Sequence, residues 1–235
     1  MSSPFTLVFA LYPGLTHLDF TGPHQFLCRL PGAVTVLASE AGGEIEAEQG
    51  MVFARTRRLA EIERCDLLCV PGGLAAADQA LNEGYLSQIR RLAASARYVT
   101  SVCNGSLILG AAGLLQGRRA ACHWQWRHLL REFGAIPDAG RVVRDGHVIT
   151  GGGVTAGIDF ALSVAAEIAG ADFAQALQLG LEYAPAPPFN SGSPELAAPR
   201  TVAAVNARLE PLLEQAAPKV RRAAQGLRRE PAGLK

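Results

Sequence analysis

The sequence predicts an α/β fold, a single-domain sandwich in which helices flank a mainly parallel central β-sheet. Three observations lead to this prediction. Short β-rich runs recur along the chain, they are apolar almost throughout rather than alternating, and helical patterns separate them. Strands that read as continuous apolar runs are typical of parallel sheets covered on both faces. The 235 residues, of which 49% are apolar, suffice for one sizeable core.

Strands and helices alternate over the first half of the chain. The predicted strands span residues 5–11, 33–39, 65–70 and 97–102. The predicted helices span residues 22–30, 85–96 and 106–115. Such alternation is the pattern of an α/β sandwich, so each of these strands should run parallel to the others.

The second half of the chain departs from this alternation. Asp145-Gly146 stands between two β-branched runs within residues 141–150, which predicts an antiparallel hairpin with a type I′ turn. Helical spacing follows over residues 155–170 and 172–183. Residues 184–199 are rich in proline and should cross the surface as irregular chain, because proline is excluded from helix interiors and central strands.

Apolar residues return at helical spacing after the proline-rich segment, at Val202, Val205, Leu209, Leu212 and Leu213. A basic end follows, with Lys219, Arg221, Arg222, Arg228 and Arg229. We therefore assign residues 1–196 to the α/β domain and residues 197–235 to a C-terminal helical extension with a basic tail. The tail should be a solvated or frayed helix, as chain ends usually are unless docked.

Composition excludes several classes of protein. The formal charge of +1 supplies no electrostatic reason to expect nucleic acid or membrane lipid as a partner. The N-terminus lacks the pattern of a secretory signal and a membrane span, so a cytoplasmic location is expected. Five cysteines without a CxxC pair speak against disulfides and zinc. The glycine-rich residues 150–160 match no nucleotide-binding motif, and no metal or cofactor is expected.

Cys103 stands where a predicted strand turns into a helix. Ligands of parallel sheets bind beyond the carboxyl ends of the strands, and N–H groups at a helix start should lower the pKa of a thiol there. Such a turn is the cysteine counterpart of the nucleophile elbow of hydrolases. A lone cysteine is more often inert packing, but the small or polar Asn104, Gly105 and Ser106 suit a tight exposed turn, and Asn104 or Ser106 could cap the helix.

Three further candidates fall near the same sheet edge. Gly72 and Gly73, in VPGGL, leave N–H groups free for a developing negative charge, although Pro-Gly-Gly is also a common turn. Asp19 lies between apolar residues, where burial would make it a general acid; taken alone, it reads as a helix cap. His123 follows a short strand and could reach the site, or serve a structural role.

The motifs together resemble the DJ-1/PfpI superfamily and, within it, the isonitrile (isocyanide) hydratases. The resemblance covers residues 5 to about 196 and is carried by LYPGLTHLDFTGPHQFL, DLLCVPGGL, SVCNGSLILGAAGLLQGRRAACHW, TAGIDFAL and PPFNSGSPE. It implies a flavodoxin-like sandwich, a homodimer and a small isonitrile substrate. The LDFTGP and PPFNSGSP segments are more restricted within the superfamily than the cysteine turn or PGG.

The resemblance also implies roles for individual residues. Cys103 would be the nucleophile and Asp19 its acidic partner, Gly72 and Gly73 would offer backbone donors, and His123 would lie nearby. The implied reaction converts an isonitrile into an N-substituted formamide through a cysteine thioimidate. Asn104 departs from the hydratase pattern, which has threonine after the nucleophile, so the substrate of this chain is open.

Two other functions remain as alternatives. An exposed thiolate of low pKa would also suit a redox or stress sensor, because it is readily oxidised to sulfenic or sulfinic acid. Similar domains form the ligand-sensing half of AraC-type regulators, but the stretch after the proline-rich segment is too short for a helix-turn-helix domain. PfpI-type members carry histidine directly after the cysteine, and its absence here counts against peptidase activity.

Overall fold

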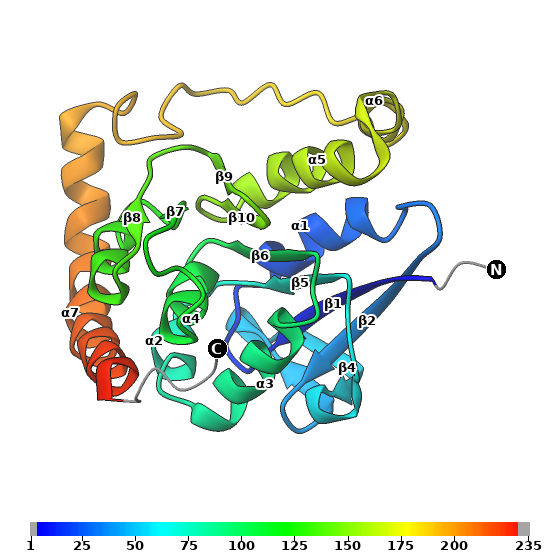
Figure 1. Ribbon diagram of the computed structural model, residues 1–235. Coiled ribbons are helices and arrows are strands. Elements are labelled where there is room, and N and C mark those ends of the chain that lie inside the picture. The colour runs from blue at the N-terminus through cyan, green and yellow to red at the C-terminus, as the bar shows by residue number, and fades with distance from the viewer. Residues whose placement is uncertain (1–3, 230–235) are drawn as a thin grey trace.

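The protein is an α/β sandwich built on one eight-stranded sheet. The computed structural model describes residues 4–229 (Figure 1). The strand order is β3-β4-β2-β1-β5-β6-β10-β9. Strands β4, β2, β1, β5, β6 and β10 are parallel to their neighbours in this list, whereas β3 and β9 add antiparallel edges. The predicted fold class is confirmed.

The strands of the main sheet are β1 (Phe5–Leu11), β2 (Ala33–Ser39), β3 (Gly43–Glu46), β4 (Val52–Arg58), β5 (Leu67–Val70), β6 (Tyr98–Val102), β9 (Val142–Asp145) and β10 (Val148–Gly151). A second, two-stranded sheet consists of β7 (Arg119–Ala120) and β8 (Ile136–Pro137). Strands β5 and β10 are buried along their whole length. Sequence analysis missed β3 and β4, because their residues are largely exposed and include charged side chains, so they lack the apolar run that marks a central strand.

The helices are α1 (His17–Leu27), α2 (Ala76–Gln79), α3 (Glu83–Ala93), α4 (Gly105–Ala111), α5 (Ala156–Ala169), α6 (Ala171–Gly180) and α7 (Pro199–Arg229). Three short 3₁₀ helices accompany them, η1 (Glu48–Gly50), η2 (Leu59–Glu61) and η3 (Arg127–Phe133). Helices α1 and α5 pack together on one face of the sheet, and α3 and α4 cover the other (Figure 1).

Helix α1 begins earlier than expected. The Thr21-Gly22-Pro23 sequence predicted a start near residue 22, but the helix begins at His17 and contains Pro23. Burial explains the difference: Phe20 is 3% exposed and packs edge-on against Phe9, which favours a helical turn ahead of the proline. Asp19 therefore lies in the first turn of α1, and its interpretation as the helix cap is wrong.

The predicted hairpin is confirmed and positions a loop of the site. Val148 lies opposite Asp145, so the two turn residues are Gly146 and His147. Gly146 has φ +63° but His147 has no positive φ, so the expected type I′ turn at Asp145-Gly146 is wrong, because a type I′ turn needs a positive φ at both positions. Strand β10 also pairs in parallel with β6, so that Gly151 lies beside Val102. The residues that follow β10 and the residues that follow β6 therefore emerge side by side at the carboxyl edge of the sheet.

Helix α7 packs against the sandwich. The proline-rich segment crosses the surface from α6 to α7 (Figure 1). Ala216, Val220 and Ala224 are buried, and Lys219 pairs with Asp78 at 2.6 Å. The expectation of a solvated or frayed end is therefore wrong for this half of α7, since small apolar side chains let it dock beside α2, α4 and η3. Residues 230–235 of the expected tail lie outside the described residues.

The described residues also bear on metals, disulfides and membranes. Cys28, Cys65, Cys69, Cys103 and Cys122 are all free thiols. Over residues 4–229, no group of three or more His, Cys, Asp or Glu side chains is arranged to hold a metal ion. No helix in the same range combines the length and the apolar character needed to cross a membrane.

Candidate active site

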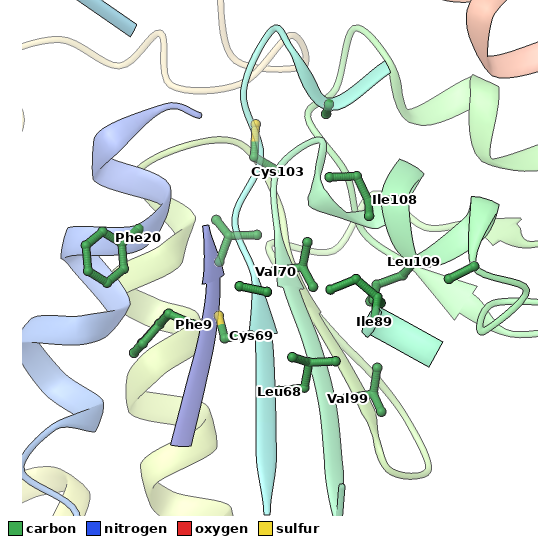
Figure 2. Close-up of a cluster of buried hydrophobic side chains, with 14 of the residues drawn as sticks. Phe9, Phe20, Leu68, Cys69, Val70, Ile89, Val99, Cys103, Ile108 and Leu109 are labelled. Carbon is green, nitrogen blue, oxygen red and sulfur yellow. The ribbon is translucent and has the colours of Figure 1, made fainter. Parts of the chain in front are cut away.

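Cys103 occupies a strained turn at the carboxyl edge of the sheet. Its φ of +58° is left-handed, a conformation that costs a non-glycine residue about 1–3 kcal/mol. The backbone N–H of Cys103 donates to the carbonyls of Gly151 at 3.1 Å and Gly152 at 2.9 Å. Figure 2 shows the sulfur beyond the strand ends, above a core that includes Phe9, Val70 and Ile108. The turn thus places the Cys103 side chain at the carboxyl end of the core, of which it is a buried member.

Asp19 brings a buried acid to the same place. The Asp19 side chain has no exposed surface, and neither of its carboxyl oxygens accepts a hydrogen bond from the described residues. Burial raises the pKa of Asp19 from 3.8 to about 7, the charge of Glu48 adds to the rise, and the nearby Cys103 side chain and Gly72 N–H oppose it. Asp19 therefore carries a proton over a large part of the neutral pH range.

The thiol of Cys103 is also buried, which changes one expectation. Cys103 is 4% exposed, and burial raises the pKa of its thiol above the usual value, as do the nearby Asp19 and Cys122. Backbone N–H groups of Val154 and Asn104 act in the opposite direction. The expectation of a lowered thiol pKa is wrong, because the helix start does not offset the loss of water around the sulfur.

Gly72 allows the segments of the site to meet. A Cβ at this position would lie 2.5 Å from the backbone nitrogen of Asn104, 2.7 Å from Asp19 Oδ2 and 2.9 Å from Cys103 Cβ. Asp19 and Cys103 therefore face each other across the hydrogen of Gly72. The neighbouring Gly73 has φ +143°, and a Cβ there would lie 2.7 Å from the nitrogen of Thr16. Both glycines are required by close packing as well as by any role in binding.

The side chain of Asn104 hydrogen-bonds to two other segments of the site instead of capping a helix. Its side chain makes no capping hydrogen bond; Nδ2 donates to the carbonyl of Gly73 at 3.4 Å, and Oδ1 accepts from the thiol of Cys122 at 3.5 Å. Ser106 does not cap either, since its hydroxyl donates to the carbonyl of Ala121 at 2.6 Å. The capping expectation for Asn104 and Ser106 is wrong, because stronger partners lie across the site.

His123 lies at the site as a neutral side chain. Burial lowers the pKa of His123 from 6.5 to about 4. Nδ1 accepts the backbone N–H of Gln125 at 3.3 Å, so in the neutral ring the proton resides on Nε2. The ring stacks on Trp124 with centroids 5.9 Å apart, and Trp126 meets it edge-on at 5.1 Å. A neutral imidazole can donate one hydrogen bond and carries no charge.

A cavity of about 320 Å³ opens beside these residues. Its walls come from four segments, residues 122–127, 139–141, 152–156 and 192–195. Val154, whose N–H faces the Cys103 sulfur, and Cys122, which bonds Asn104, both line it. Cys103 itself does not line the cavity, but these two lining residues lie next to it, so a space large enough for a small organic molecule adjoins the buried thiol.

Glu48, which was not predicted from the sequence, connects two segments of the site through hydrogen bonds. Its carboxylate accepts the hydroxyl of Thr16 at 3.0 Å and the backbone N–H of Leu74 at 2.7 Å. These bonds join the segment before α1 to the segment after Gly73. Glu48 stands in a polar stretch between β3 and β4, and no local signal distinguishes it from the other surface acids there.

The fold and the site together define a class of protein, an α/β sandwich in which a cysteine at a strained strand-to-helix turn meets a buried acid. The model of the DJ-1/PfpI family matches residues 6–167. This chain belongs to the DJ-1/PfpI family.

The chain is also similar to individual proteins of known name or structure. The isonitrile hydratase of Pseudomonas putida is 48% identical over 206 residues, which is 88% of this chain and 90% of the relative. A solved THiJ/PfpI family protein from Pseudomonas syringae superimposes with a TM-score of 0.87 at 38% identity, covering 94% of this chain and 90% of that one. The HTH-type transcriptional regulator GlxA of Rhizobium meliloti is 31% identical over 57% of this chain and 42% of its own length.

Proposed function

We propose that this protein is an isonitrile hydratase that adds water to R–N≡C and releases the N-substituted formamide R–NH–CHO. The observation that carries the proposal is the buried Asp19 carboxyl, with a pKa raised to about 7, facing the thiol of Cys103. The 48% identity with the Pseudomonas putida enzyme over 88% of the chain supports the choice of substrate. Cys103 is the proposed nucleophile and Asp19 the proposed acid and base.

In the first half of the reaction, the sulfur of Cys103 attacks the terminal carbon of the isonitrile. One S–C bond forms, and the proton shared by Cys103 and Asp19 moves to that carbon, giving the thioimidate R–N=CH–S–Cys. The N–H groups of Val154 and Asn104 favour the thiolate in this step because they lower the pKa of Cys103. Asp19 takes this proton from the thiol and delivers it to the carbon.

In the second half, water adds to the thioimidate carbon. The deprotonated Asp19 takes a proton from this water and passes it to the nitrogen, giving R–NH–CH(OH)–S–Cys. The C–S bond then breaks, the hydroxyl proton returns to the Cys103–Asp19 pair, and the formamide leaves. The N–H groups near Gly72 and Gly73 and the Nε2–H of His123 are the proposed donors that hold the substrate, and Asn104 holds the PGG loop against the nucleophile.

The test is direct. The purified protein is mixed with one aliphatic and one aromatic isonitrile, such as cyclohexyl and phenyl isonitrile, and the formyl proton of the product is followed by NMR. We expect catalytic turnover of at least one of the two isonitriles, with one molecule of formamide formed for each molecule of isonitrile consumed. Absence of turnover across a panel of aliphatic and aromatic isonitriles would overturn the proposal.

The two alternative functions have less support from the structure. Cys103 is 4% exposed with a raised thiol pKa, whereas a peroxide sensor needs an accessible thiolate. Among residues 197–229, the only long element is the continuous helix α7, and no helix-turn-helix pair is present in that range. Neither observation favours a sensor or a regulator over an enzyme.

Gly72→Ala tests the close approach of the three segments. The added methyl group would have to displace backbone at Asn104 and the side chains of Asp19 and Cys103, all within 3.0 Å. A displacement of reacting groups by about 1 Å costs about 10²-fold in rate, so we expect a loss of that order in kcat/KM. Gly180→Ala is the matched control, because nothing lies within 4 Å of its Cβ position. Equal activity of the two variants would contradict this account of Gly72.

Glu48→Gln tests the second acid of the site. The substitution keeps the shape but removes the charge that raises the pKa of Asp19, so that pKa should fall. Because the reactive pair of Cys103 and Asp19 holds one proton, which is its state above the pKa of Asp19, the acidic limb of the pH dependence of kcat should move to lower pH. Glu44→Gln, on the exposed part of β3, is the control and should leave the limb in place. An unmoved limb in Glu48→Gln, with kcat intact, would show that Glu48 does not act on Asp19.

A further inference from the structure

We propose that the cavity beside Cys103 selects isonitriles that carry a carboxylate, and that Arg127 binds this carboxylate. The inference rests on the proposed function and names its substrate class. Its starting point is Arg127, a cavity-lining residue to which the mechanism gives no role.

Arg127 is the cavity-lining cation whose guanidinium group makes no ion pair or side-chain hydrogen bond with the described residues. It lines the cavity at the start of η3 and is half-buried, and within residues 4–229 it forms no ion pair and no side-chain hydrogen bond. A guanidinium group presents five N–H donors in a planar fork that matches a carboxylate. Holding such a group half-buried without an acceptor is unfavourable, and a carboxylate on the substrate would supply the missing acceptor.

The other charged groups of the cavity are already engaged. Arg141 donates to Asp159 at 2.6 Å and to the hydroxyl of Thr155 at 3.3 Å. Glu195 is exposed, and hydrogen bonds from its own backbone N–H and from Ser193 lower the pKa of its carboxyl most; the charge of Arg127 also lowers it, although the two side chains form no ion pair in residues 4–229. The charged lining residues thus carry two cations and one anion, and the guanidinium of Arg127 is the one left to meet a ligand.

The remaining lining suits a small organic body between the isonitrile group and the carboxylate. Trp124, Val154, Ala156 and Pro194 supply apolar surface, and the cavity volume is about 320 Å³. Residues 192–195 belong to the SGSPE stretch of the proline-rich segment, which forms one wall of the cavity as it crosses the surface. A substrate placed here has its isonitrile carbon toward Cys103 and its substituent toward Arg127.

The experiment compares isocyanoacetate with its methyl ester, which has the same reacting group but no charge. For the wild-type protein we expect a higher kcat/KM for isocyanoacetate. Arg127→Gln should lower the ratio of the two kcat/KM values by about 10- to 100-fold, mainly through KM, as expected for the loss of a charge-assisted pair. Arg131→Gln removes the same charge from an exposed position of the same η3 and should leave the ratio unchanged.

A binding measurement separates this inference from the hydration itself. N-formylglycine, the product expected from isocyanoacetate, is titrated into the wild-type protein and Arg127→Gln, and the tryptophan fluorescence, to which the cavity-lining Trp124 contributes, is followed. Tighter binding to the wild-type protein supports the carboxylate site even if no isonitrile is turned over, in which case hydration alone fails. Turnover of neutral isonitriles with no preference for the carboxylate, and equal N-formylglycine binding by both proteins, would overturn the role of Arg127 alone.

Discussion

Cys103→Ala is expected to abolish formamide production while leaving the fold intact. The substitution removes the only atom that forms a bond to the isonitrile carbon in the proposed mechanism, and loss of a nucleophile costs an enzyme about 10⁴- to 10⁶-fold in rate. The backbone of the turn should persist, because the N–H of residue 103 still donates to Gly151 and Gly152. The measurement is the initial rate of formamide formation by NMR, together with a thermal unfolding curve.

The matched control for this prediction is Cys28→Ala. Cys28 is a free thiol in the turn that follows α1, and the proposed mechanism gives it no role. This variant should retain wild-type rates, which shows that loss of a thiol as such is harmless. Formamide production by Cys103→Ala at a rate comparable to that of Cys28→Ala would contradict the assignment of the nucleophile.

Asp19→Asn should come close to the same loss of activity. An amide of the same shape cannot deliver the proton to the isonitrile carbon or take one from water, and general acid or base catalysis is worth about 10²- to 10⁴-fold. In the wild-type protein, the rate of the first half-reaction should rise as the pH rises through about 7, because the Asp19 carboxyl loses its proton there while the Cys103 thiol, whose pKa is raised, keeps the one proton that the pair shares. Activity of Asp19→Asn within a factor of a few of the wild-type rate would contradict the proposed role.

The same substitution has an opposite effect on stability. The pKa of Asp19 is about 7 in the folded protein and near 3.8 when the chain is unfolded, so between these values the folded state holds the extra proton. The contribution of Asp19 is therefore fully present below pH 4 and is lost as the pH rises to about 7. The asparagine side chain does not ionise in this range, so Asp19→Asn should have a higher Tm than the wild-type protein at pH 8 but not at pH 4. An equal difference at both pH values would show that Asp19 is not buried with a raised pKa.

The sequence was sufficient to predict the central strands of the sheet, the antiparallel hairpin and the strand-to-helix turn that holds Cys103. Those features depend on local signals, namely apolar runs, Asp145-Gly146 and the small residues after the cysteine. The start of α1 was predicted too late, because the burial of Phe20 depends on Phe9, which belongs to another element. The position of Pro23 in the sequence gives no information about this packing between two elements.

The chemistry of the candidate site was less accessible to sequence analysis. Asp19 and Cys103 are far apart in the sequence and meet only because Gly72 lets their segments approach closely. Glu48 and residues 192–195 reach the site through tertiary contacts alone. The pKa of the Cys103 thiol follows from complete burial rather than from its place at a helix start. Burial of this kind is a property of the assembled fold, so local sequence patterns cannot supply it.

The central claim is that hydration passes through a covalent bond between Cys103 and the isonitrile carbon. It is tested most directly by mixing the protein with one equivalent of isonitrile, quenching in acid at times spanning the first turnover, and measuring the mass of the peptide that contains Cys103. We predict a transient increase by the mass of one isonitrile, which appears before the formamide and decays as the formamide accumulates. Formamide that forms while this peptide stays unmodified at every quench time would contradict the claim.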